Sequence, residues 1–112
     1  MAKDSQIIKH ILKYCDSIEA TRRRFGDEKS LKADTDYFNS VCMQLLQIGE
    51  LAKSLSDEFT NENDEIDLKG FKGARDVMAH QYHNVQLGII WDAVNSEIPH
   101  LKEFCEGYLE NN

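Results

Sequence analysis

The stretch that decides the fold is residues 35–59, TDYFNSVCMQLLQIGELAKSLSDEF. Its apolar residues recur in alternating steps of three and four, which places them along one side of an α-helix. The members of this stripe are Phe38, Val41, Leu45, Ile48, Ala52, Leu55 and Phe59. We therefore expect a core helix that starts near Thr35 or Asp36.

The same helix carries a second set of side chains on its opposite side. At about 100° per residue, Met43, Leu46 and Glu50 project away from the apolar stripe. A helix with apolar atoms on two faces is typical of one that packs between its own bundle and a second subunit. We therefore expect a homodimer, with coverage by a flanking loop as the alternative.

The rest of the chain has a similar helical period. A first helix is expected from Asp4, as its N-cap, to Phe25, with Gly26 ending it. Residues 26–34 are interpreted as a polar connection, and residues 60–70 as an acidic loop in which Asp67 caps a shorter third helix. The last helix carries a stripe of seven residues, Leu87, Trp91, Val94, Ile98, Leu101, Cys105 and Tyr108. The sequence thus predicts one all-α domain over residues 1–112, an antiparallel four-helix up-and-down bundle whose last helix is kinked or divided near Pro99.

Composition limits the function classes. The 112 residues carry a net charge of −7, and no run approaches the ~18 apolar residues of a membrane helix, so we expect a cytoplasmic protein without a membrane partner. An acidic chain lacks the basic surface typical of nucleic-acid binders. The dense basic cluster, Arg22–Arg24, is explained most simply by favourable charge at a helix C-terminus, with an RNA contact as the second interpretation. Cys15, Cys42 and Cys105 are expected to be reduced core residues.

The densest group of reactive side chains lies in residues 73–83, GARDVMAHQYH. Arg75 offers a planar, permanently charged guanidinium that can pair with phosphate oxygens. His80 titrates near neutral pH and can accept a proton from a ribose hydroxyl. Together they form a minimal set for cutting RNA without a metal, because the 2′-hydroxyl itself attacks the phosphorus.

Spacing complicates this interpretation. On one ideal helix Arg75 and His80 lie about 140° apart, so either the helix ends near His80 or a second subunit completes the site. Arg75 and Tyr82 would fall within about 20° of each other on a continuous helix, and Glu50 could then orient Arg75. In the simplest alternative, Arg75 pairs with Asp76 on the surface and no site exists.

A metal site is a further alternative for the same segment. Asp76, His80 and His83 lie at offsets of four and three and could place three ligands near one helical face. A di-iron site of the four-helix-bundle type would need Glu-x-x-His motifs on two helices, and the one match, Glu97 to His100, is interrupted by Pro99.

Two segments resemble a known family. Arg75-Asp76-x3-His80-x-Tyr82, followed by IIWDAV at 89–94, resembles the Arg-x4-His-x-Tyr signature of HepT-like toxins, a branch of the HEPN domains. Gln47-Ile48-Gly49-Glu50-Leu51-Ala52 resembles the family's Ile-Gly-Glu-Ala segment, and Gly73 stands where the family often has Gly. Leu68 departs from the pattern, because many members carry Trp there.

This resemblance implies a dimeric helical bundle that acts as a metal-independent endoribonuclease toxin and needs no cofactor. Arg75 and His80 would be catalytic, with Asp76 and Glu50 in support. A cognate nucleotidyltransferase antitoxin would silence the toxin by transferring AMP to Tyr82, where the added phosphate would repel RNA. The alternative function is a non-catalytic helical partner, bound as a substrate or regulatory subunit by such a nucleotidyltransferase.

Overall fold

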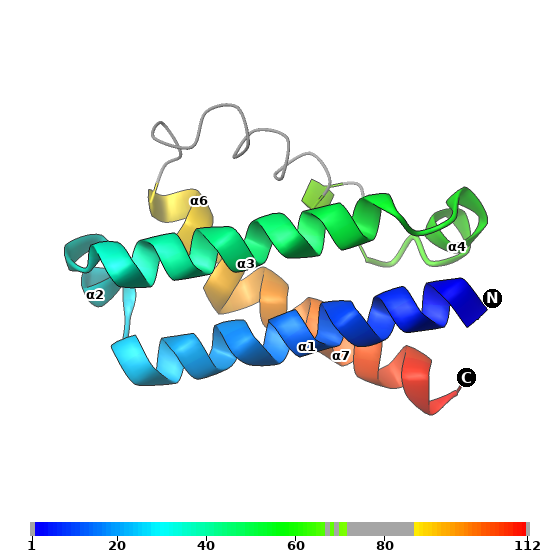
Figure 1. Cartoon of the computed structure of the whole chain (residues 1–112), viewed down its shortest axis with the longest axis horizontal. Helices are drawn as coiled ribbons and strands as arrows, with labels where there is room; N and C mark the ends of the chain where they lie inside the picture. The colour runs from blue at the N-terminus through cyan, green and yellow to red at the C-terminus, as the bar shows by residue number, and fades with distance from the viewer. Residues whose placement is uncertain (1, 67, 69, 72–86, 112) are drawn as a thin grey trace.

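The computed structural model describes residues 2–66, 68, 70–71 and 87–111, and its regular structure is helical (Figure 1). The elements are α1 (Ala2–Phe25), α2 (Glu28–Ala33), α3 (Thr35–Lys53), α4 (Asp57–Glu62), α6 (Leu87–Asp92), the π-helical segment η2 (Ala93–Glu97) and α7 (Ile98–Glu110). The described ranges contain no strand, and the all-α prediction is confirmed. Most of the predicted third helix lies outside the described residues.

Three helices build the core. α1 and α3 run antiparallel along the length of the molecule, and α7 packs against α1 (Figure 1). The largest fully buried side chains come mainly from these helices, among them Ile8, Ile11, Ile18, Tyr37, Val41, Ile48, Ile98 and Leu101. Some positions differ from the predicted stripes. In α3, Tyr37 is completely buried whereas Phe38 is half-buried. In α6, Ile90 is buried whereas Leu87 and Trp91 are half-buried. None of the helices in the described ranges is long and apolar enough to cross a membrane.

The connection after α1 is partly helical, which corrects the interpretation of residues 26–34 as a polar connection without period. Gly26 has a φ of 111°, a conformation that L side chains rarely adopt, and it ends α1 as expected. Asp27 then caps α2 by accepting a hydrogen bond from the Ser30 N–H. The buried Leu31 holds this six-residue helix against the core.

Asp4 does not cap α1, contrary to the prediction, because α1 already begins at Ala2. The Asp4 carboxylate instead accepts hydrogen bonds from the Ser56 N–H (3.0 Å) and the Ser56 hydroxyl (2.8 Å). Ser56 in turn caps α4 by accepting the Phe59 N–H. The helix predicted to continue to Phe59 is therefore divided at residues 54–56, and α4 extends into the expected acidic loop.

The last helical stretch changes its hydrogen-bond register before Pro99. The Ile98 N–H donates to the Ala93 carbonyl, five residues back, as in a π-helix. Pro99 has no N–H for a regular helical bond to Asn95, and its ring would crowd that carbonyl. The wider turn of η2 accommodates both effects, so α6 and α7 follow each other without a loop.

The three cysteines are reduced and completely buried, as expected. Burial raises the pKa of the Cys42 thiol to about 11 and the pKa of the Cys105 thiol to about 12. The pKa of Cys15 is also raised, first by burial and second by the nearby Cys105. Thiols that remain protonated at neutral pH are poor nucleophiles, so these residues serve packing rather than catalysis.

Candidate functional site

The structure describes the residues that come before and after the candidate site in the sequence. Arg75, Asp76, His80 and Tyr82 fall within residues 72–86, outside the described residues. Phe71 precedes this segment and packs half-buried against the core, while Leu87 follows it as the first residue of α6. In the view of Figure 1, residues 70–71 and α6 both lie on the side of α3 that faces away from α1.

Glu50 is the one predicted site residue that the structure describes. It lies exposed on α3, seven residues after Met43 and four after Leu46, so all three share one helical face. Met43 is 57% exposed and Leu46 is half-buried, whereas the opposite face of α3 carries the completely buried Val41 and Ile48. The prediction is confirmed for Met43 and Glu50, which are exposed and point away from the core. It is wrong for Leu46, which is half-buried and packs against the core.

A second large apolar side chain is exposed on α6. Ile89 is 58% exposed, and with Met43 it makes up the exposed large hydrophobic residues of the described ranges. Ile89 is not among the core or site residues predicted from the sequence. Its exposure could have been predicted, because Ile89 is a strongly apolar residue that falls outside the core spacing of Leu87, Trp91 and Val94.

The basic cluster at the end of α1 contacts α6. The Arg22 guanidinium lies 4.8 Å from the centroid of the Trp91 ring, a cation–π contact. Arg24 stacks in the same way on Phe25, at 5.2 Å. Arg23 and Arg24 remain exposed, so positive charge is presented at the end of α1 that contacts α6. Trp91 is half-buried and packs against the core, with Arg22 over its ring.

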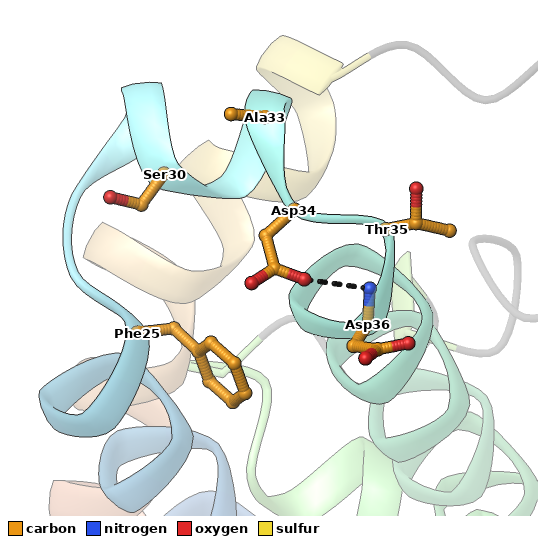
Figure 2. A pocket seen from close by; sticks show the side chains of 6 residues that line it. All are labelled: Phe25, Ser30, Ala33, Asp34, Thr35 and Asp36. Carbon is orange, nitrogen blue, oxygen red and sulfur yellow. Dashed lines mark hydrogen bonds between the residues drawn. The ribbon is translucent and has the colours of Figure 1, made fainter.

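A hollow of about 450 Å³ lies close to this cluster in sequence, between the end of α1 and the start of α3 (Figure 2). It is lined by Phe25, Ser30, Ala33, Asp34, Thr35 and Asp36. The Asp34 carboxylate accepts the N–H groups of Asp36 (2.9 Å) and Tyr37 (3.2 Å) and thereby occupies the donors of the α3 N-terminus. With two acidic residues and its helical donors occupied, this hollow is unsuited to RNA phosphate.

Tyr37 contacts one of the residues that line this hollow. The Tyr37 ring stacks on Phe25 with centroids 5.2 Å apart, and its hydroxyl donates to the Gly26 carbonyl at 2.8 Å. Burial raises the pKa of the Tyr37 hydroxyl, which is partly countered by the positive charge of Arg22. Tyr37 thus remains a neutral donor that fixes the turn between α1 and α2.

The described residues contain no group of three or more side chains placed to hold a metal ion. The alternative metal ligands Asp76, His80 and His83 lie outside the described residues. Glu97 and His100, the interrupted di-iron match, are both exposed.

Comparison with known proteins identifies relatives for most of the chain. A family model described as ribonuclease HepT-like matches residues 11–107. A "putative RNase" of Caldanaerobacter subterraneus is 30% identical over 103 residues, which cover 92% of this chain and 91% of that protein. No solved structure matches the chain.

Two further relatives are matched over only part of their own length. A Methanocaldococcus jannaschii protein named "gamma-glutamylcyclotransferase and putative RNase" is 36% identical over 110 residues, and the chain spans 46% of its length. The "probable ribonuclease HepT" of Thermococcus cleftensis is 33% identical over 63 residues, or 57% of its length.

Proposed function

Since this chain belongs to the HepT-like ribonuclease family, we propose that it is a metal-independent endoribonuclease whose reaction is carried by Arg75 and His80. The family match over residues 11–107 carries this proposal, because it includes both residues. Arg75 and His80 also have the chemistry that RNA cleavage requires.

In the proposed reaction the ribose 2′-oxygen attacks the adjacent phosphorus while His80 takes the hydroxyl proton. The bond from phosphorus to the 5′-oxygen then breaks, and the leaving oxygen takes a proton from water, which gives a 2′,3′-cyclic phosphate and a 5′-hydroxyl; His80 later returns its proton to solvent. Arg75 stabilises the additional negative charge on the phosphorane through paired hydrogen bonds. Asp76 and Glu50 act as positioning residues for the guanidinium. DNA is not cut because it lacks the attacking hydroxyl.

We further propose that RNA contacts the exposed end of α1. Arg23 and Arg24 supply positive charge on a chain whose net charge is −7, and the adjacent Arg22 contacts α6 through Trp91. α6 begins five residues after Tyr82 in the sequence. A local basic patch in contact with α6 would attract the phosphate backbone although the whole protein is acidic.

The regulatory part of the proposal is a toxin–antitoxin pair. The proposed antitoxin is a small nucleotidyltransferase that transfers AMP to the Tyr82 hydroxyl, two residues from His80. The added phosphodiester would compete with RNA for Arg75 and repel the incoming backbone. We also propose a homodimer through the α3 face that carries Met43, Leu46 and Glu50, because the apolar Met43 is 57% exposed there and Leu46 is only half-buried.

Product analysis tests the reaction. Purified chain incubated with RNA in excess EDTA should release fragments that end in 2′,3′-cyclic phosphate. The same oligonucleotide with one 2′-deoxy residue should resist cleavage at that position only. Cleavage that requires added metal, or that proceeds at the deoxy position, would refute the proposed reaction. A pure chain that binds the nucleotidyltransferase but cleaves no RNA would favour the alternative of a non-catalytic partner.

Intact mass tests the regulation. Co-expression with a nucleotidyltransferase encoded next to this chain should add one or more AMP units, and Tyr82→Phe should abolish the addition. An addition that persists in Tyr82→Phe would contradict the assignment of Tyr82.

A further inference from the structure

Two hollows meet at Gly107 on the exposed side of α7. One, of about 450 Å³, lies between α7 and the turn after α4 and is lined by Asn63, Glu65, Ile66, His100, Glu103, Phe104, Gly107, Tyr108 and Asn111. The other, of about 840 Å³, is lined by Leu12, Glu103, Glu106, Gly107, Leu109 and Glu110. Because they share Glu103 and Gly107, they lie on either side of these two residues, and we call the two hollows together the α7 groove. It lies toward the end of the molecule that holds both termini (Figure 1).

Packing among the residues that the structure describes does not account for the glycine at position 107. Glycine in the interior of a helix lowers helix stability relative to alanine. A Cβ built on Gly107 would meet nothing within 4 Å, so no neighbouring side chain in the described structure requires a glycine there. Glycine at an open helix surface permits close approach of another backbone or a large side chain from outside.

The floor of the α7 groove is apolar. Phe104 and Tyr108 are half-buried and contact the core ring of Phe59, with centroids 6.3 and 5.1 Å from it. Leu12 and Leu109 are half-buried on the other side of Gly107. Apolar surface in a concave setting offers binding energy to a partner that can remove it from water.

The rim of the α7 groove is negatively charged. Four carboxylates line it, those of Glu65, Glu103, Glu106 and Glu110, and the lining residues that the structure describes include no Lys or Arg. None of the four forms an ion pair with another residue that the structure describes. By contrast, Asp16 and Glu19 on α1 are paired with Lys102 at 3.1 and 2.8 Å. The groove therefore presents uncompensated negative charge around an apolar floor.

We propose that the α7 groove is a docking surface for a basic, amphipathic segment of a partner protein. An apolar side chain of that segment would lie over Gly107 and contact Phe104 and Tyr108, while its Lys or Arg residues would pair with the four glutamates. Charge complementarity selects this occupant, because an acidic segment or a nucleic-acid backbone would be repelled. The proposal does not depend on the nuclease chemistry and concerns residues outside the Arg75–His80 segment.

A pair of synthetic peptides tests the proposal on the intact chain. The probe is a short amphipathic helix of leucine and lysine, and its control has glutamate in place of every lysine. NMR titration should show binding of the lysine peptide, with chemical-shift changes concentrated at Phe104, Gly107, Tyr108 and Glu106. Higher salt should weaken this binding, because charge pairs at the rim are screened.

Matched variants separate the groove from general attraction to an acidic protein. Gly107→Leu fills the groove and Glu106→Lys reverses one rim charge, and each should weaken binding by about tenfold or more. Their controls are Gly88→Leu on α6, where an added Cβ also meets nothing within 4 Å, and Glu28→Lys on the exposed face of α2. Both controls should bind the lysine peptide as the wild type does.

Three results would overturn the proposal. The first is equal binding of the two peptides, and the second is unchanged affinity of folded Gly107→Leu and Glu106→Lys. The third is a set of groove resonances that shift with protein concentration in the absence of peptide, since a second copy of the chain would then occupy the groove.

Discussion

The contact between Asp4 and Ser56 connects the first turn of α1 to the cap of α4 across 52 residues of sequence. Asp4 is 3% exposed, so its charge is stabilised mainly by the two hydrogen bonds it accepts. Asp4→Asn places an NH₂ group where one of these acceptors lies. We expect a loss of about 1–3 kcal/mol in the free energy of unfolding, measured by urea denaturation.

Asp92 supplies the control for this prediction. Asp92 is exposed and makes no capping hydrogen bond from its side chain, so Asp92→Asn should change the free energy of unfolding by less than about 0.5 kcal/mol. Equal stabilities of the two variants would show that the Asp4–Ser56 contact contributes nothing measurable.

The buried Cys42 thiol predicts a loss of stability at alkaline pH. Burial raises its pKa from an ordinary value near 9 to about 11. Between these values the unfolded chain loses the thiol proton and the folded chain retains it, so stability falls as pH rises. Wild type should lose about 1.4 kcal/mol per pH unit more than Cys42→Ala over this range, measured by urea denaturation at each pH. Parallel pH profiles for the two proteins would contradict this account.

At the scale of the site residues, the sequence indicates chemistry more readily than geometry. Arg75 and His80 indicate the class of reaction, because guanidinium and imidazole groups suit phosphate transfer. Spacing alone leaves Arg75 and His80 about 140° apart on an ideal helix, so their convergence depends on how the backbone runs between them. The outward face of α3 could be predicted, because burial of Val41 and Ile48 fixes where Met43 and Glu50 point.

The length of a helix determines whether the helix and its buried face can be predicted from the sequence. α1 and α3 extend over several turns, so their apolar stripes repeat often enough to define the buried face. α2 and α4 have six residues each and show too little of the period to be recognised. Their positions depend on the caps Asp27 and Ser56, and the partner of Ser56 is remote in sequence. Local pattern therefore cannot separate such helices from polar loops.

Two glycines should respond to alanine in opposite directions. Gly26 has a φ of 111°, and an added Cβ would lie 2.9 Å from Ser30 Oγ. Gly26→Ala should therefore lower the free energy of unfolding by about 1–2 kcal/mol. Gly107 faces open space within α7, so Gly107→Ala should raise it by about 0.5–1 kcal/mol. Thermal and urea denaturation of both variants measure these changes, and shifts of the same sign would contradict the roles assigned to the two residues.

At the scale of the whole molecule, the proposed homodimer depends on the face of α3 that carries Met43. Met43 is 57% exposed on a helix whose other side is fully packed. Met43→Glu would place a charge in the proposed dimer interface and should shift the protein from dimer to monomer in sedimentation velocity. Ala20→Glu adds the same charge at an exposed position on α1 and should leave the dimer intact. A wild type that sediments as a monomer at all concentrations would refute the homodimer.

The most direct measurement is the rate of RNA cleavage by purified wild type, Arg75→Ala and His80→Ala, each shown to be folded by circular dichroism. If guanidinium and imidazole carry the reaction, wild type cleaves RNA in EDTA and each variant is slower by about 100-fold or more. Folded Arg75→Ala and His80→Ala proteins that cleave RNA as fast as wild type would contradict the account.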